Sequence, residues 1–278
     1  MNHKHLFMLC AVALCNPLSL LAQKQGNDSI DGYRFVYEYT YPGRKSKLND
    51  RQALDIDPKA GTSVFYSENN ANKQKMINST KVSGTADLGV LLSQINAMPK
   101  GASWVVYKNL PKAGMLTYTD RMGKDFKYTD DMPAIKWTVS SDRKELCGYP
   151  CQKAEAEFLG RHWTAWYTTE VPLSDGPWKL CGLPGMILEA SDADTLFHFT
   201  CIGMESVRLA PIAIPDKKYL KCTHDEMERE YRKKNEDRVA YLRNMFGEDT
   251  KIYDKNGKER TTMKVDVPYI ERREGDKQ

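Results

Sequence analysis

Residues 177–192, "PWKLCGLPGMILEASD", place a tight bend directly before an apolar segment in the middle of the chain. Gly182 and Gly185 permit backbone angles that other residues avoid, and Pro184 restricts the bend between them. We therefore expect a rigid turn that delivers the chain into a strand over 186–191. The apolar side chains around this turn either plug one end of the core or line the mouth of an apolar cavity. In the second case, the ligand-binding residues are Trp178, Leu180, Leu183, Pro184 and Met186.

The segments near this turn alternate between two faces, as half-buried strands do. Residues 163–169 and 195–203 show this period of two, and so does the early segment 33–41, "YRFVYEYTY". The links at 160–161 and 192–194 are too short for parallel crossovers, so they favour antiparallel hairpins. The Asp-Ala-Asp link at 192–194 could bind a hard cation, but Asp residues are also common in turns, and we predict a turn.

Three other segments have distinct patterns. Residues 85–98 carry apolar residues at helical spacing, whereas 68–84 are polar and predict a loop or a short exposed helix. Residues 216–246 contain charges of both signs with few apolar residues, which predicts one long charged helix. This helix either packs on the edge of the sheet or docks a partner protein. Residues 247–278 predict a polar C-terminal hairpin or tail.

The N-terminal residues have the layout of a secretory signal. Lys4 precedes a short apolar stretch, and Ala22 is a small residue at the expected cleavage point. Cys10 and Cys15 each follow a leucine, which argues against a lipoprotein. We expect an exported chain that is periplasmic, secreted or associated with the outer membrane. The chain after the signal has no apolar segment long enough to span a bilayer. The formal charge of +4 is spread along the sequence, which argues against a nucleic-acid partner.

Five cysteines follow the signal: Cys147, Cys151, Cys181, Cys201 and Cys222. Export permits disulfides, and an odd number leaves at least one thiol free. Cys222 lies in a charged segment, and we expect it to be the free one. A bridge between Cys147 and Cys151 would close a very small loop. A link from this segment to Cys181 or Cys201 is favoured, and the sequence does not choose between them.

Signatures of common catalytic sites are missing from the sequence. It contains no Gly-x-Ser-x-Gly, phosphate loop, dinucleotide-binding glycine pattern or His-Glu-x-x-His. Cys147 and Cys151 could ligate zinc with His162 or His198, but a second paired half is absent. Cys181 could act as a nucleophile, yet no histidine lies in a recognisable context for it. We predict no catalytic residue, no metal and no cofactor.

Two blocks, "GYPCQKA" at 148–154 and "GRHWTAWYTTEVPLSDGPWKLCGLPGMILEASD" at 160–192, resemble the core of the GLPGLI family of exported proteins from diderm bacteria. The motif that names the family stands here as GLPGMI, 182–187, with Met186 replacing a leucine. This resemblance implies a lipoprotein-carrier architecture of the LolA/LolB type. Such a fold is a curved antiparallel sheet, or half-barrel, wrapped around helices, with a concave face for an apolar ligand. The resemblance supplies no catalytic residue.

We therefore predict a mainly β protein with helices (α+β): a half-barrel meander, a short helix and one long charged helix. The predicted parts are a signal peptide (1–22), the β domain with the GLPG motif (23–215), the charged helix (216–246) and the C-terminal tail (247–278). The predicted function is non-catalytic binding of a lipid, acyl chain or hydrophobic peptide, or a role in envelope maintenance. The alternatives are a thiol- or metal-dependent hydrolase using Cys181, Cys151 or His162, and a module whose charged helix docks an envelope protein.

Overall fold

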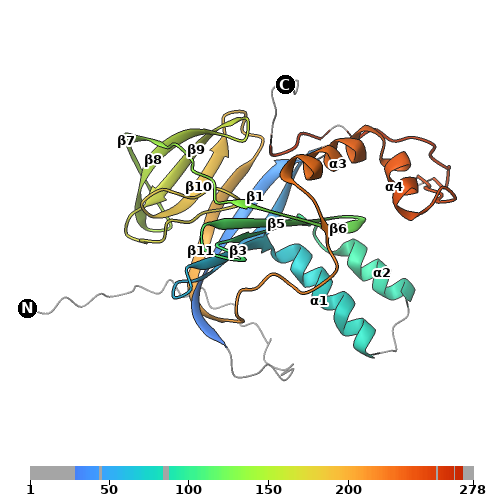
Figure 1. Ribbon diagram of the computed structural model, residues 1–278, viewed down its shortest axis with the longest axis horizontal. Helices are drawn as coiled ribbons and strands as arrows, with labels where there is room; N and C mark the ends of the chain where they lie inside the picture. Colours follow the sequence, from blue (N-terminus) through green and yellow to red (C-terminus); the bar gives the residue numbers. More distant parts are fainter. Residues whose placement is uncertain (1–28, 44–45, 84–87, 255, 266, 272–278) are drawn as a thin grey trace, which may run out of the picture.

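The computed structural model describes residues 29–43, 46–83, 88–254, 256–265 and 267–271 (Figure 1). The predicted signal peptide, 1–22, lies outside these residues and stays a prediction. No helix in the described part of the chain is long and apolar enough to cross a membrane.

Twelve strands of the described chain form one open sheet. They are β1 (Ile30–Pro42), β2 (Lys47–Asp57), β3 (Thr62–Ser67), β4 (Val105–Lys108), β5 (Met115–Met122), β6 (Lys124–Asp131), β7 (Thr138–Leu146), β8 (Tyr149–Phe158), β9 (Arg161–Thr168), β10 (Met186–Asp192), β11 (His198–Leu209) and β12 (Leu220–Lys221). Their order is β12-β6-β5-β4-β3-β2-β1-β11-β10-β9-β8-β7. The pairs are antiparallel except β12–β6, which is parallel.

The predicted single meander is wrong: the sheet consists of two meanders, β1–β6 and β7–β11, which meet where β1 pairs with β11. The chain leaves β6 near one edge of the sheet and starts β7 at the other edge. Alternation identifies which segments are strands, but it does not reveal which distant strands pair. The antiparallel hairpins expected around 160–161 and 192–194 are present as β8–β9 and β10–β11.

The long charged helix predicted over 216–246 is wrong. This region contains β12 and two short helices, α3 (His224–Glu236) and α4 (Arg238–Phe246). Asp237 separates them with an extended backbone, and its carboxylate accepts hydrogen bonds from the first amides of α4. Thr223 and Glu226 form a capping box at the start of α3. Each cap stabilises a new helix start, so the charged stretch is split into two helices.

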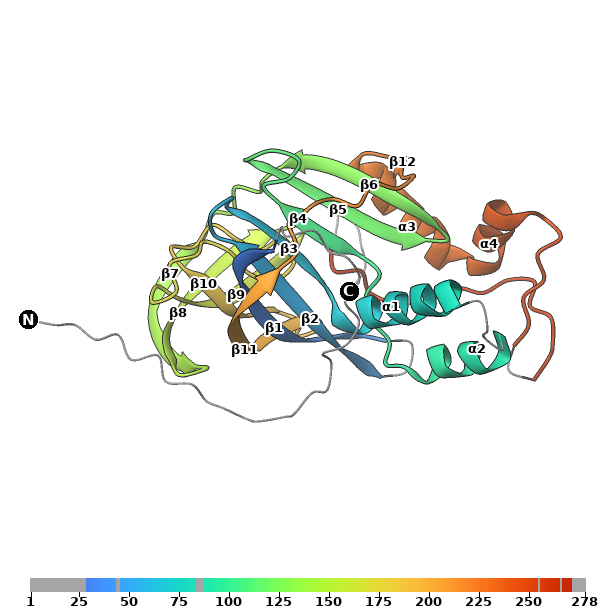
Figure 2. The ribbon, with the colours of Figure 1, turned by 90° about the horizontal axis from the view of Figure 1, so that it is seen from below.

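Polar residues 68–83, expected as a loop or short helix, form the sixteen-residue helix α1 (Glu68–Ser83), followed by α2 (Leu88–Ala97). The predicted start of the second helix at 85 falls outside the described residues. Helix α1 contacts β2 and β3, and α3 contacts β6 (Figure 2). The described helices therefore lie around the β2–β6 part of the sheet, away from β7–β10 (Figure 1).

Aromatic side chains fill the core on the face where β1 and β11 meet. Tyr39 and Phe199 are register partners, and their rings stack with centroids 4.3 Å apart. Trp163 of β9 packs against Trp178, with ring centroids 5.6 Å apart. Near the end of the described chain, Ile270 returns to this core and is buried. The core thus joins both meanders to the segment that carries the GLPG motif.

Candidate functional site

The turn at 182–187 is a plug in the core. Trp178, Leu180 and Met186 are fully buried, Leu183 is nearly so, and Pro184 alone of the predicted ligand-binding residues is exposed. Four of the five predicted residues therefore contact the protein interior. This arrangement favours the plug over the cavity mouth.

Both glycines of the turn have positive φ angles, for different reasons. Gly182, with φ 91°, would place a Cβ atom 3.9 Å from the indole nitrogen of Trp137, an ordinary contact distance. Gly185, with φ 155°, lies so close to Thr168 that a Cβ atom would stand 2.0 Å from its carbonyl oxygen. Gly182 is required by backbone angle alone, whereas Gly185 is also required by close packing against β9.

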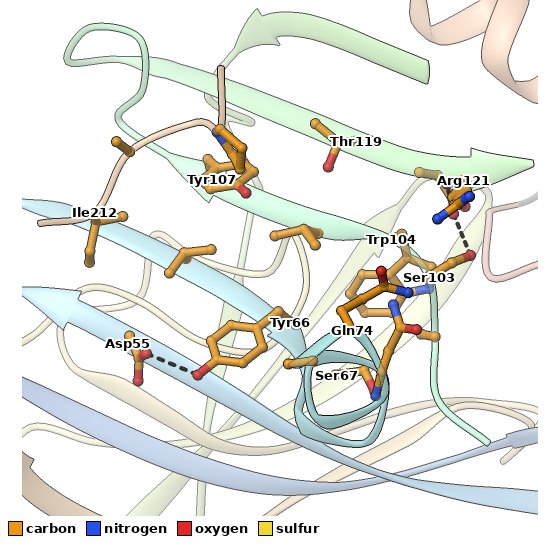
Figure 3. A pocket seen from close by; sticks show the side chains of 18 of the residues that line it. Asp55, Tyr66, Ser67, Gln74, Ser103, Trp104, Tyr107, Thr119, Arg121 and Ile212 are labelled. Atoms are coloured by element: carbon orange, nitrogen blue, oxygen red, sulfur yellow. Dashed lines mark hydrogen bonds between the residues drawn. The ribbon is translucent and has the colours of Figure 1, made fainter. Parts of the chain in front are cut away.

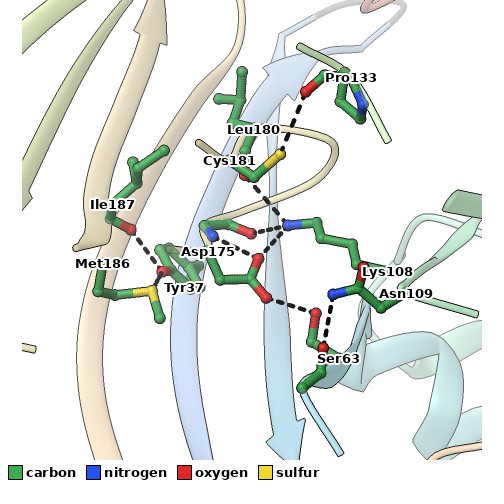
Figure 4. A network of polar contacts seen from close by, with 12 residues as sticks. Tyr37, Ser63, Lys108, Asn109, Pro133, Asp175, Leu180, Cys181, Met186 and Ile187 are labelled. Carbon is green, nitrogen blue, oxygen red and sulfur yellow. Dashed lines mark hydrogen bonds and ion pairs between the residues drawn. The ribbon is translucent and has the colours of Figure 1, made fainter. Parts of the chain in front are cut away.

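A buried lysine holds the segment before the turn (Figure 4). Lys108, at the end of β4, forms an ion pair with Asp175 and donates hydrogen bonds to the carbonyl oxygens of Gly176 (2.7 Å) and Leu180 (3.2 Å). Ser63 of β3 donates to the second carboxylate oxygen of Asp175 at 2.6 Å. The first meander thereby fixes the plug of the second.

A second buried lysine of the plug segment, Lys179, is surrounded by aromatic rings and a carboxylate. Its ammonium lies over the rings of Tyr118 (4.9 Å) and Tyr128 (5.3 Å) and pairs with Glu271 at 2.5 Å. His224 of α3 contacts the other oxygen of Glu271. Burial opposes ionisation of Glu271, but Lys179 and His224 outweigh it and hold the pKa of this carboxyl below its usual value.

A third buried cation fastens the end of the described chain. Arg161 pairs with Asp192 at 2.7 Å, and both side chains are almost completely buried. The same guanidinium donates to the carbonyl oxygens of Tyr269 and Ile270, both at 2.7 Å. Asp192 therefore forms a structural ion pair, at the start of the turn that the sequence predicted over 192–194. The sequence did not show that its partner would be Arg161, because the two residues lie on different strands.

A groove of about 580 Å³ lies on the opposite face of the first meander. It is lined mainly by β2–β5, α1 and the segment 209–219, with further residues from β1 (Arg34), β6 (Asp125) and the end of β11 (Arg208). Its strand residues alternate with core residues, as a pleated sheet requires. The groove side includes Asp55, Val64, Tyr66, Tyr107 and Thr119, and the core side includes Leu54, Phe65, Val106 and Tyr118.

Apolar and polar side chains both line the groove along its length (Figure 3). Ile212, Tyr107 and the Asp55 carboxylate lie toward one end, and Tyr66 lies between the two ends. Gln74 and Arg121 lie at the other end. Among the described residues, the Arg121 guanidinium has neither a hydrogen bond nor an ion pair. It is therefore available to an anionic group.

The other acidic and basic groups at the groove floor already have partners. Arg34 binds Asp55 through two hydrogen bonds of 2.7 and 2.8 Å, and Tyr66 donates to the same carboxylate at 3.1 Å. Ser103 donates to Asp120 at 2.5 Å. Burial raises the pKa of Asp120 and of the Tyr66 phenol. The floor is a rigid polar surface, and Arg121 is the cation left for a ligand.

The five described cysteines are free thiols. Cys151 and Cys181 are buried, and Cys181 has only a weak contact with the carbonyl oxygen of Pro133 at 4.0 Å. His162 is partly exposed, and its ring nitrogen contacts Glu157 at 2.8 Å. In the described part of the chain, no three histidine, cysteine or acidic side chains gather as a metal site would require.

The structure brings two of the four predicted disulfide candidates together. Cys147 and Cys201 come together, with the Cys147 sulfur 3.1 Å from the Cys201 carbonyl oxygen. Cys151 lies in β8 and Cys181 in the plug.

The groove residues were not identified from the sequence at all. Their only local signal is that polar and aromatic residues alternate with core residues along β2 to β5.

Comparison with known proteins gives a family match over one short span. Residues 160–189 match the family model described as "Protein of unknown function (Porph_ging)". This span holds β9, the plug and the start of β10. No curated protein matches the chain.

Solved structures give only distant likeness. A structure of PNGF-II has 13% identity and a TM-score of 0.47, and covers 72% of this chain but 32% of its own. An uncharacterized conserved protein from Thermus thermophilus has 8% identity and a TM-score of 0.35, and covers 69% of this chain and 90% of its own. The chain therefore spans about a third of the length of PNGF-II. What the comparisons identify is the span 160–189, which resembles a family of unknown function.

Proposed function

We propose that this chain is an exported, non-catalytic protein that binds an apolar ligand with an anionic group, such as a fatty acid or an acidic lipid, in the groove. The observation that carries the proposal is the polarity of the groove. Aromatic and apolar residues such as Tyr66, Tyr107 and Ile212 line the groove, and Arg121, unpaired among the described residues, lies at the end away from Ile212. A guanidinium binds carboxylate or phosphate oxygens in a bidentate manner.

The size of the groove supports a ligand of this class. Cavities that bind small molecules commonly measure about 300–1,000 Å³. The segment 209–219 covers the sheet with Leu209, Ile212 and Pro215, so an acyl chain would contact apolar atoms on two sides. The resemblance to the GLPGLI family implies a lipoprotein-carrier architecture, which would suit an acyl ligand, and we propose a relationship to those carriers.

Binding of oleate to the purified chain tests this proposal, with oleyl alcohol as a neutral probe of the same chain length. We expect saturable binding of oleate and weaker binding of oleyl alcohol. Arg121→Gln should lower oleate affinity roughly tenfold and leave oleyl alcohol affinity unchanged, because only oleate carries the charge. Ile212→Asp should weaken both probes, because it replaces an apolar contact for the acyl chain with a charge.

Arg143→Gln is the matched control. Arg143 is exposed on β7, far along the sheet order from the groove strands. This substitution should change neither affinity. Absence of saturable oleate binding, or equal effects of Arg121→Gln and Arg143→Gln, would reject the groove as the binding site.

A further inference from the structure

Cys147 is held in a rigid hairpin turn. Leu146 and Tyr149 are register partners at the ends of β7 and β8, so the turn contains only Cys147 and Gly148. Both have left-handed backbones, with φ of 50° and 78°. This is the conformation of the two-residue turns that match the twist of a hairpin. The turn therefore fixes the direction of the Cys147 side chain.

This turn lies against β11, although β9 and β10 separate β8 from β11 in the sheet order. The Cys147 sulfur is 3.1 Å from the carbonyl oxygen of Cys201. Cys201 is buried in the core cluster and pairs in register with Tyr37 of β1. The β7–β8 end of the sheet must curl over to bring the two cysteines together.

The two thiols have complementary reactivity. Cys147 is exposed and Cys201 is buried. The neighbouring Cys201 side chain lowers the pKa of the Cys147 thiol to about 7. Cys147 and burial together raise the pKa of Cys201, whose own thiol donates to the carbonyl oxygen of Gly203 at 3.4 Å. Thiolates are the nucleophiles of disulfide exchange, so Cys147 is the sulfur that reacts first.

We propose that Cys147 and Cys201 form an intramolecular disulfide once the chain reaches an oxidising compartment. The oxidant is a low-molecular-weight or protein disulfide. The Cys147 thiolate attacks one sulfur of this disulfide, forms a mixed disulfide and releases one thiolate. Cys201 then loses its proton to solvent and attacks the Cys147 sulfur, which releases the second thiolate. Two protein thiols are oxidised to one disulfide, and the oxidant is reduced to two thiols.

The other cysteines fit this reaction less well. Burial raises the pKa of Cys151 to about 11, and burial also raises the pKa of Cys181. Cys181 lies in the plug, where its only thiol contact is with the carbonyl oxygen of Pro133. The sequence left Cys181 and Cys201 as alternative partners for the 147–151 segment, and the structure assigns Cys201. The plug segment lies between Cys147 and Cys201 in the sequence, so the disulfide would close a loop that contains it.

Peptide mapping of the full chain tests the bridge directly. The reduced protein is incubated with oxidised glutathione, blocked with N-ethylmaleimide and digested without reductant. We expect a linked pair of peptides containing Cys147 and Cys201, and a protein about 2 Da lighter because two hydrogens are lost. Fragmentation of the linked peptides distinguishes Cys147 from Cys151. A bridge to Cys151 or Cys181, a stable glutathione adduct, or two blocked thiols would overturn the proposal.

Thermal unfolding supplies a second readout. Reduction of the oxidised wild-type protein should lower Tm by roughly 5–15 °C, because the bridge restricts the unfolded chain. Cys147→Ser, in an exposed turn, should abolish both the linked peptides and this difference. Cys222→Ser is the matched control and should retain both. A wild-type Tm that does not change on reduction, with the bridge mapped, would show that the bond does not stabilise the fold.

Discussion

The plug and the groove use charged side chains in opposite ways. In the plug, Lys108, Lys179 and Arg161 are buried, and each is paired with a carboxylate. In the groove, Arg121 is exposed and, within the described chain, unpaired. A buried cation whose partner is already present has no capacity left for a ligand, whereas an exposed one does. The conspicuous motif of the sequence is therefore structural, and the inconspicuous face is the better binding surface.

The largest expected effect lies in the plug. Lys108→Ala should lower the free energy of unfolding by roughly 3–5 kcal/mol, because it leaves the largely buried Asp175 carboxylate without its partner. Urea unfolding monitored by tryptophan fluorescence measures it. Lys233→Ala, which removes a well-exposed lysine from a surface pair, should cost less than about 1 kcal/mol. Similar losses for the two variants would contradict a structural role for the plug cation.

The two glycines of the plug provide a matched comparison. Gly185→Ala should cost roughly 2–4 kcal/mol, because the new methyl group would collide with the Thr168 carbonyl. Gly182→Ala meets no close atom and should cost about 1 kcal/mol through its positive φ alone. Thermal unfolding of both variants measures the difference. If Gly182→Ala is the more damaging, the turn is not packed against β9 as described.

The third prediction concerns acid stability. The pKa of Glu271 is lower in the folded chain than its ordinary value, so the carboxylate contributes stability above that ordinary value, near pH 4.5. This contribution is lost as the pH falls through the lower, folded pKa. Glu271→Gln should therefore be less stable than wild type at neutral pH and should lose less stability below pH 4.5. Unfolding curves between about pH 7 and pH 3 test this, and parallel losses in both proteins would refute it.

The smallest effect is expected in the groove. Arg121→Gln should change the free energy of unfolding by no more than about 0.5 kcal/mol, because an exposed side chain without partners contributes little to the fold. Chemical unfolding measures this value on the same preparation used for oleate binding. A loss as large as that of Lys108→Ala would remove the contrast between the two regions.

Much of the β structure could be predicted from local patterns. Alternation located the strands near 33–41, 163–169 and 195–203, and short links indicated antiparallel hairpins. The break at Asp237 could also have been predicted, since Thr223 and Glu226 have capping-box spacing and Asp237 is a good helix cap. The abundance of charge in 216–246 concealed these signals, because i,i+4 pairs favour a helix without showing where it ends.

The groove could not be predicted, because its residues come mainly from β2 to β5, from α1 and from 209–219. The same holds for the partners of the buried cations. Lys108 and Asp175 lie in different meanders, and Arg161 reaches the segment that ends the described chain. A local pattern identifies a strand face, but the partner across the sheet depends on strand order.

By itself, the sequence determined the antiparallel β class, the strained turn at 182–187 and the likeness of residues 160–189 to a family of unknown function. These properties depend on residues close together in the chain, where alternation and glycine geometry act locally. Only the tertiary structure decided that β1 pairs with β11, that the motif is a plug, and that Cys147 meets Cys201. The reason is physical: pairing, burial and thiol contact join residues that are distant in sequence, and they exist only after the sheet has assembled.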